Sequence, residues 1–269
     1  MRTALFLISL ALSSAGCSEP QEFGDKIGAS DAGSPSISAR MQSQGAEPVS
    51  REEETERYRY EWSYPAAAAA IPLLANKLDA MGAQSLARLK DEANRDYESA
   101  AGGGWEPRPH SAATKWSVVA DVPDYLSLSS QVATYGGGAH GNYTKTSMVW
   151  DKREGRAMNG VEMFASPVAL NRALGPTLCA ALNAQREARR GEPADPASTE
   201  WPDNCPAITD ATVLVGSSNG ETFDRIGIYF GPYAAGPYAE GDYELNFPVS
   251  GAVLDAVKPE YADAFSIRR

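Results

Sequence analysis

Residues 116–132, WSVVADVPDYLSLSSQV, decide the fold because they carry two strand patterns separated by a turn. Apolar residues fall at every second position in 116–122, and a similar run covers 126–132, as in strands with one buried face. Pro123 and Asp124 between the runs favour a tight turn. Neighbouring strands joined by a short turn pair antiparallel, so the sequence predicts an antiparallel hairpin near the middle of the chain.

Similar patterns on both sides of this hairpin predict further strands. Aromatic and charged residues alternate over residues 58–62, and strand-like segments follow at 143–150, 212–215, 222–230 and 243–247. Such short segments, bounded by turn residues, are typical of strands in antiparallel sheets.

Three helices are predicted from apolar residues spaced three or four positions apart. The first runs over residues 65–89, and the third is a short helix at 253–257. The second covers 167–182, with Ser166 as its N-cap and a proline at its first position. Gly175–Pro176 lies inside this helix and is expected to kink it.

These elements together predict an α+β fold of antiparallel sheets with packed helices. We expect a single compact region made of two related halves, residues 55–155 and 156–269, with an irregular excursion at 190–207.

The N-terminus has the pattern of an export signal. Residues 1–16 contain one basic residue, a nine-residue apolar stretch (ALFLISLAL) and a run of small residues. The apolar stretch spans only about 14 Å as a helix, too short to cross a bilayer. The small residues before Cys17 resemble a bacterial lipobox, in which the cysteine is acylated with fatty acids such as palmitate. The sequence departs from that pattern at Ser14, where leucine is usual, and ordinary cleavage after Ala15 is the alternative.

Residues 17–54 are predicted to be a flexible tether. They are rich in Gly, Ser, Gln, Glu and Pro, a composition that buries too little apolar surface to fold. The charged run 51–57 would be the solvated end of this tether, which has a reach of about 30 Å. By analogy with bacterial lipoproteins, Ser18 rather than Asp after the lipidated cysteine implies sorting to the outer membrane in an organism with two membranes, with the domain facing the periplasm.

Charge and cysteine content exclude some partners and predict one crosslink. The formal charge of −11 disfavours nucleic acid and anionic lipid surfaces, and could attract cationic partners. If Cys17 is acylated, Cys179 and Cys205 remain, and an oxidising compartment favours a disulfide between them. Two separately buried thiols are the alternative.

Two short motifs match enzyme signatures but lack the required context. Residues 136–141 (GGGAHG) fit a dinucleotide-binding loop, yet a strand follows where a helix is needed. Residues 216–220 (GSSNG) fit a nucleophile elbow, but Asn-Gly predicts a turn. His110 and His140 are the only histidines, and neither belongs to a cluster with zinc-ligand spacing. We therefore expect no cofactor and no metal, and we expect His110 to lie in an exposed loop.

Three stretches make the chain similar to a known family: Ser127–Ser129, the loop Gly137–Gly141, and the stretch 230–241 (FGPYAAGPYAEG). They resemble the extracytoplasmic domain pair of the RsiV-type anti-sigma factor and of the PdaC peptidoglycan deacetylase. The resemblance covers about 58–261 and implies an α+β domain. In the RsiV type it implies a receptor that binds lysozyme. The deacetylase chemistry belongs to a separate domain, and no anti-sigma segment is expected here.

The resemblance and the residue types predict a lipid-anchored envelope protein without catalysis, which binds a lysozyme-like protein or a cell-wall component. Glycines permit close backbone approach, and exposed tyrosines are enriched at interfaces. The expected binding residues are Gly137, Gly138, His140, Gly141, Tyr229, Tyr233 and Tyr238. These residues could instead only build a hairpin and its core. The alternative functions are a carboxylate-dependent hydrolase or transferase of envelope glycans, and a structural lipoprotein.

Overall fold

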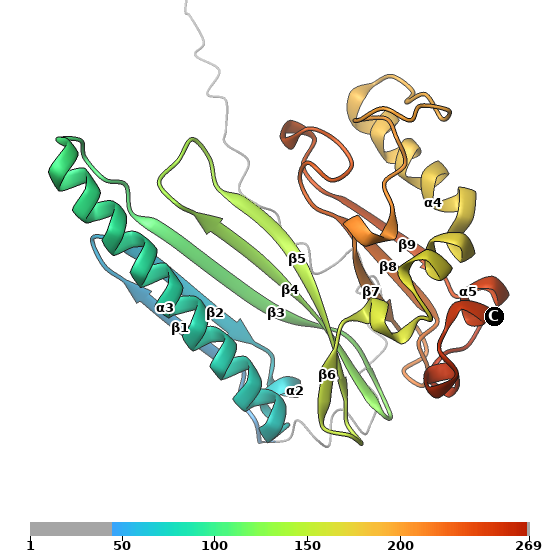
Figure 1. Cartoon of the computed structure of the whole chain (residues 1–269). Coiled ribbons are helices and arrows are strands. Elements are labelled where there is room, and N and C mark those ends of the chain that lie inside the picture. Colours follow the sequence, from blue (N-terminus) through green and yellow to red (C-terminus); the bar gives the residue numbers. More distant parts are fainter. Residues whose placement is uncertain (1–44, 268–269) are drawn as a thin grey trace, which may run out of the picture.

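The hairpin predicted from residues 116–132 lies in the middle of a six-stranded sheet (Figure 1). The computed structural model describes residues 45–267. The first sheet has the order β1-β2-β3-β4-β5-β6, and its strands are β1 (Val49–Glu54), β2 (Tyr58–Tyr64), β3 (His110–Val122), β4 (Tyr125–Tyr135), β5 (Asn142–Asp151) and β6 (Arg156–Met158). The second sheet consists of β7 (Thr212–Gly216), β8 (Arg225–Phe230) and β9 (Tyr243–Pro248).

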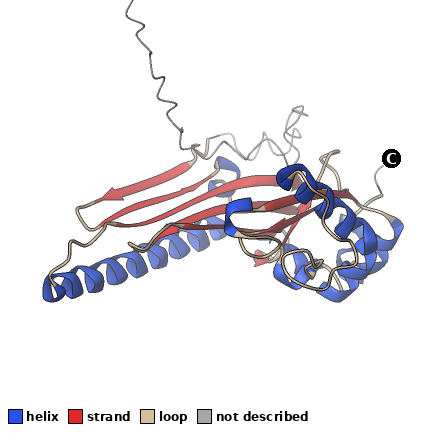
Figure 2. Cartoon of the chain, turned by 90° about the horizontal axis from the view of Figure 1, so that it is seen from above, coloured by secondary structure: helices blue, strands red, loops and turns tan. Residues whose placement is uncertain are grey.

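The α+β class is confirmed, and all but one of the named strand pairs are antiparallel. The exception is the pair β2–β3, which is parallel. Parallel neighbours need a long crossover connection, and here α2 (Ala66–Ala69) and α3 (Pro72–Gly103) provide it. Figure 2 shows α3 running along one face of the first sheet.

The tether predicted over residues 17–54 is wrong at its C-terminal end, because Val49–Glu54 forms the edge strand β1. The backbone of β1 pairs with β2, Glu54 forms an ion pair with Arg59 on β2, and two further charged side chains form ion pairs with α3. Arg51 lies 2.7 Å from Asp79, and Glu53 lies 2.7 Å from Lys90. The signal, Cys17 and the rest of the tether lie outside the described residues.

Helix α3 extends well beyond residue 89, where the sequence pattern predicted its end. Leu74, Leu78 and Leu89 are buried against the sheet. Gly82 allows α3 to lie against the Trp62 ring of β2, because a Cβ at this position would be only 3.0 Å from the ring. Gly104 caps the C-terminus of the helix and has a φ of 74°, the left-handed conformation typical of this position.

The second sheet and α4 (Pro167–Arg190) form the other layered part. Ser166 caps α4 as predicted, and the helix has a kink at Gly175. The predicted disulfide between Cys179 and Cys205 is present. The last helix, α5 (Gly251–Ala256), begins two residues earlier than predicted.

The boundary predicted at residues 155/156 does not separate the two parts. Strand β6 completes the first sheet through pairing with β5. One apolar core also joins both sheets, since Val122, Tyr125 and Val149 pack in the same cluster as Ile226 and Ile228. Within residues 45–267, no helix has the length and apolar character needed to cross a membrane.

Candidate binding surface and cavity beside the 136–141 loop

The glycine-rich loop 136–141 is the tip of the β4–β5 hairpin. Figure 1 places this tip at the same end of the molecule as the end of α3 and the segment after β8. Gly137 has a φ of 77°, which a residue with a side chain adopts only at a cost. Tyr135 donates a hydrogen bond to the carbonyl oxygen of Gly138 at 3.0 Å, closing the loop on itself.

The side of this loop that faces away from α3 contacts the segment after β8, so the structure brings together two of the three stretches that carried the family resemblance. The Tyr238 hydroxyl donates to the Gly141 carbonyl oxygen at 2.8 Å. The His140 ring stacks on Tyr238 with 4.2 Å between ring centroids. His140 Nδ1 lies 2.8 Å from the Gly141 carbonyl oxygen, so the histidine also orders the loop locally.

Two exposed aromatic side chains extend this contact into a surface. Tyr233 is 53% exposed and lies 5.5 Å from Tyr238 between ring centroids. Trp201 is 54% exposed, and its Nε1 lies 3.4 Å from the Tyr233 carbonyl oxygen. We call Trp201, Tyr233, Tyr238 and His140 the aromatic surface. Sequence reasoning missed Trp201, because it lies in the irregular excursion and no pattern there connects it to residue 233.

Tyr229 does not belong to this surface, which corrects the expectation for that residue. It is only 1% exposed and lies within β8. Burial and the nearby Asp242 carboxylate raise the pKa of its hydroxyl. Both faces of β8 are covered, so an aromatic side chain at this position packs inside the protein and does not reach the surface.

A buried arginine holds the aromatic surface in place. Arg186 on α4 is fully buried, and its guanidinium donates to the Ala235 carbonyl oxygen at 2.6 and 3.0 Å. It also donates to the carbonyl oxygens of Asp203 at 2.9 Å and Asn204 at 3.0 Å. These contacts fix the segment that carries Tyr233 and the excursion that carries Trp201. The disulfide adds a covalent connection between α4 and residue 205.

One turn along α4, Arg190 makes a second connection to the same segment. Its Nε lies 2.8 Å from Glu240 Oε1, and it also pairs with Asp203. Burial would raise the pKa of Glu240, but hydrogen bonds from Arg190 and Tyr243 together lower it. The carboxylate is therefore charged at neutral pH.

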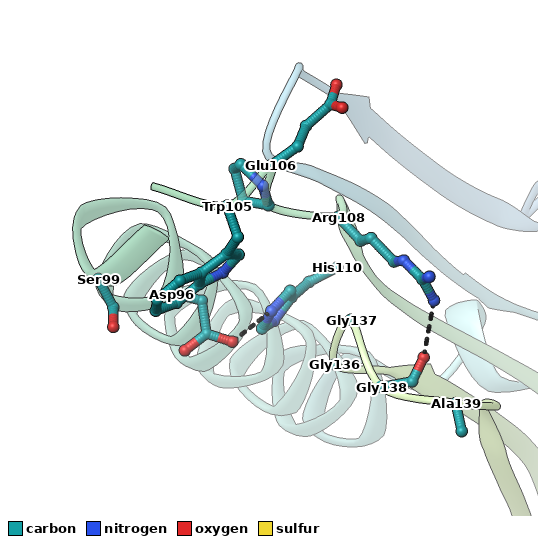
Figure 3. Close-up of a pocket in the computed structure, with 11 residues that line it drawn as sticks. Asp96, Ser99, Trp105, Glu106, Arg108, His110, Gly136, Gly137, Gly138 and Ala139 are labelled. Carbon is teal, nitrogen blue, oxygen red and sulfur yellow. Dashed lines mark hydrogen bonds and ion pairs between the residues drawn. The ribbon is translucent and has the colours of Figure 1, made fainter. Parts of the chain in front are cut away.

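The near side of the loop borders a cavity of about 560 Å³, shown in Figure 3. Its walls come from the end of α3, the 105–108 connection, the first residue of β3 and residues 136–139. Trp105, at one wall, is 57% exposed. Arg108 donates to the Gly138 carbonyl oxygen at 3.2 Å and to the Tyr135 hydroxyl at 3.3 Å.

His110 lies at this cavity and is buried, which overturns the expectation of an exposed loop residue. It is 5% exposed and begins β3, where its backbone N–H donates to the Arg57 carbonyl oxygen. Its Nε2 lies 2.9 Å from Asp96 Oδ2 on α3. The reason is that α3 runs past residue 89, which places Asp96 over the start of the sheet.

The structure shows the context of the segment 216–220, which matches the sequence of a nucleophile elbow. The 216–220 segment is a turn, in which Ser218 N donates to Asp224 Oδ1 at 2.7 Å, and no helix follows it. Among residues 45–267, no group of three or more His, Cys, Asp or Glu side chains could hold a metal ion.

Comparisons with known proteins relate the chain to one family model and to solved structures. Residues 51–143 match the family described as Deacetylase PdaC. A DUF3298 protein from Pseudomonas aeruginosa PAO1 has 15% identity and a TM-score of 0.43, with 84% of this chain and 100% of that chain covered. A DUF3298 family member from Bacteroides fragilis NCTC 9343 has 16% identity and a TM-score of 0.41, covering 76% and 90%. No curated protein matches the chain. The family match includes the residues that line the cavity and the whole of the 136–141 loop.

Proposed function

We propose that this chain is a lipid-anchored binding module of the bacterial cell envelope. In this proposal Cys17 carries the lipid, the protein lies at the outer membrane facing the periplasm, and the domain catalyses no reaction.

The observation that carries the proposal is the aromatic surface. Trp201 and Tyr233 are more than half exposed although both are large and apolar. Such side chains contribute most of the binding free energy at many interfaces. Because Arg186 and the disulfide already fix the segments that bear them, little conformational freedom would be lost on binding.

The partner that fits the charge of the chain is a cationic protein, such as a lysozyme-like muramidase. The formal charge of −11 would speed association at low salt and weaken it at high salt. A cell-wall component is the other occupant that the aromatic surface could accept.

The test is retention of lysozyme by the immobilised full chain at low and at high salt. We expect retention at low salt, a steep loss at high salt, and affinity about tenfold weaker in Trp201→Ala and Tyr233→Ala. Leu73→Ala and Val168→Ala, which are 64% and 63% exposed elsewhere, are matched controls and should bind normally. No retention at low salt would exclude lysozyme as the partner. Crosslinking from His140 in cells would then show whether a cell-wall component is captured, and no capture would refute the binding function.

The geometry around the cavity supports binding over glycan hydrolysis. A carboxylate-dependent glycosidase needs two carboxyl groups on the two sides of one bond, about 5 to 9.5 Å apart. The Asp96 carboxylate forms a hydrogen bond with His110, whereas Figure 3 shows the Glu106 side chain pointing away from Asp96. Release of reducing sugar from peptidoglycan by the full chain, lost in Asp96→Asn, would overturn the proposal of a non-catalytic domain.

The anchor is tested by incorporation of radiolabelled palmitate in living cells. We expect label in the full chain and in Ser18→Ala, and none in Cys17→Ser. Equal labelling of Cys17→Ser would refute the anchor and leave the binding surface unaffected.

A further inference from the structure

The cavity on the near side of the loop is separate from the aromatic surface and has its own set of chemical groups. It is lined by Asp96, Trp105, Arg108 and His110, together with the glycines of the loop. Its volume of about 560 Å³ lies within the range of small-molecule sites. None of the residues of the aromatic surface lines it.

One wall of the cavity is suited to a positive group. Asp96 uses one carboxylate oxygen, Oδ2, in its hydrogen bond with His110, and its side chain is 60% exposed. Trp105 and this carboxylate both line the cavity (Figure 3). An ammonium group that contacts an indole face and a carboxylate together gains a cation–π interaction and an ion pair.

The opposite wall is suited to a negative group. Arg108 uses its Nη1 nitrogen for both of its hydrogen bonds, to the Gly138 carbonyl oxygen and to the Tyr135 hydroxyl. The remaining N–H groups of the guanidinium form the fork that binds a carboxylate. The hydrogen bond with Tyr135 raises the pKa of Arg108, so the side chain keeps its charge at neutral pH.

We propose that this cavity binds a small zwitterion, an amino acid or short peptide with a free ammonium and a free carboxylate. A simple anion would meet the Asp96 carboxylate, and a simple cation would meet Arg108. A zwitterion places each charge against its opposite. The inference goes beyond the proposed function, because it needs neither the lipid nor the partner at the aromatic surface.

The arrangement of the walls is built into the backbone. The Trp105 ring lies directly over Gly103, where an added Cβ would come within 1.6 Å of the ring. The buried His110 forms a hydrogen bond with Asp96. The Tyr135 hydroxyl forms hydrogen bonds with both Arg108 and the loop carbonyl of Gly138. The charged groups are therefore positioned before a ligand arrives, which lowers the cost of binding.

The test is calorimetric titration of the full chain with glycine, diglycine and triglycine, which separate the two charges by increasing distances. We expect one of them to bind. Its N-acetyl and C-amide forms, each lacking one charge, should bind about tenfold more weakly or worse. Asp96→Asn, Arg108→Gln and Trp105→Ala should weaken binding similarly, and Trp105→Phe should weaken it less.

Matched controls come from the same helix, outside the cavity. Asp91→Asn and Arg95→Gln remove the same charges from exposed positions on α3 and should leave the affinity unchanged. Asp96→Asn keeps a hydrogen-bonding partner for His110, and thermal unfolding of each variant checks the fold. Gly103→Ala, which displaces the Trp105 ring, should weaken binding in a folded protein.

Three outcomes would overturn the inference. The first is no binding of any of the three zwitterions at about 1 mM. The second is equal binding of the forms that lack one charge. The third is binding of neutral N-acetylglucosamine in place of the zwitterions. Each of these results leaves lysozyme retention by the aromatic surface unaffected, so the two proposals fail separately.

Discussion

At the residue scale, one buried cation determines the shape of the aromatic surface. The Arg186 guanidinium donates hydrogen bonds to the carbonyl oxygens of Asp203, Asn204 and Ala235 and to the side-chain oxygen of Asn183. Burial lowers its pKa, and the hydrogen bonds offset the cost of burying the charge. The guanidinium thus replaces secondary structure as the connection between two irregular segments.

Arg186→Met should therefore destabilise the protein by about 2–4 kcal/mol, because three carbonyl oxygens lose their donors inside the fold. Urea unfolding measures the change. The matched control is Arg172→Met at an exposed position on α4, which should change stability by less than about 0.5 kcal/mol. Equal stability of both variants would show that the carbonyl groups find other donors.

The ion pair of Arg190 and Glu240 makes the free energy of unfolding depend on pH. The pKa of Glu240 in the folded chain is below its usual value of 4.5, so the unfolded chain binds the proton first as the pH falls. The stabilisation is complete above about pH 4.5 and is lost as the pH falls through the folded pKa. The free-energy difference between wild type and Glu240→Gln should thus be constant near neutral pH and shrink in acid. Urea unfolding at several pH values measures it, with exposed Glu187→Gln as the control. A difference that stays constant as the pH falls from neutral to well below about 4.5 would contradict this account.

At the element scale, the packing of α3 on the sheet depends on one glycine. Gly82→Ala places a Cβ 3.0 Å from the Trp62 ring, and this indole is buried in the core between β2 and α3, where it cannot move far. We expect a loss of about 1–3 kcal/mol, although alanine favours the helix by about 1 kcal/mol. Gly102→Ala, where nothing lies within 4 Å, should stabilise the helix by about 0.5–1 kcal/mol. Thermal unfolding compares the two variants, and stabilisation by both would show that Trp62 yields.

Elements with a clear period were predictable, and their ends were less so. The 116–132 hairpin, the N-cap Ser166 and the kink at Gly175 follow local rules and are found as predicted. The edge strand β1 was missed because its charged side chains pair with residues distant in sequence or on the next strand, Glu53 with Lys90 on α3 and Glu54 with Arg59 on β2, which no local pattern reveals. The extension of α3 past residue 89 was missed for a related reason, since its last turns are mostly polar.

At the scale of the whole molecule, the loop could be predicted as part of the site, but the cavity could not. The glycines of 136–141 and the Tyr233–Tyr238 stretch carry composition signals that mark unusual backbone and surface. His110, Asp96 and Trp105 carry none. They meet only because a parallel crossover returns the chain to the start of β3, and this pairing is a property of the topology.

The region that matches the PdaC family, residues 51–143, should not fold without the second sheet, even when extended to the end of β6. Val122, Tyr125 and Val149 are buried in the core shared with β8 and α5, and the Tyr125 ring lies 6.0 Å from that of Phe223. Residues 45–158 alone would expose this apolar face to water, which favours aggregation or a loosely packed state.

We expect the fragment to lack near-ultraviolet dichroism and a cooperative thermal transition, and the two-sheet chain to unfold in one step. Coexpression with residues 159–267 should restore both signals if the shared core is the cause. A monomeric fragment with a cooperative transition would instead show that the six-stranded sheet and α3 are stable by themselves.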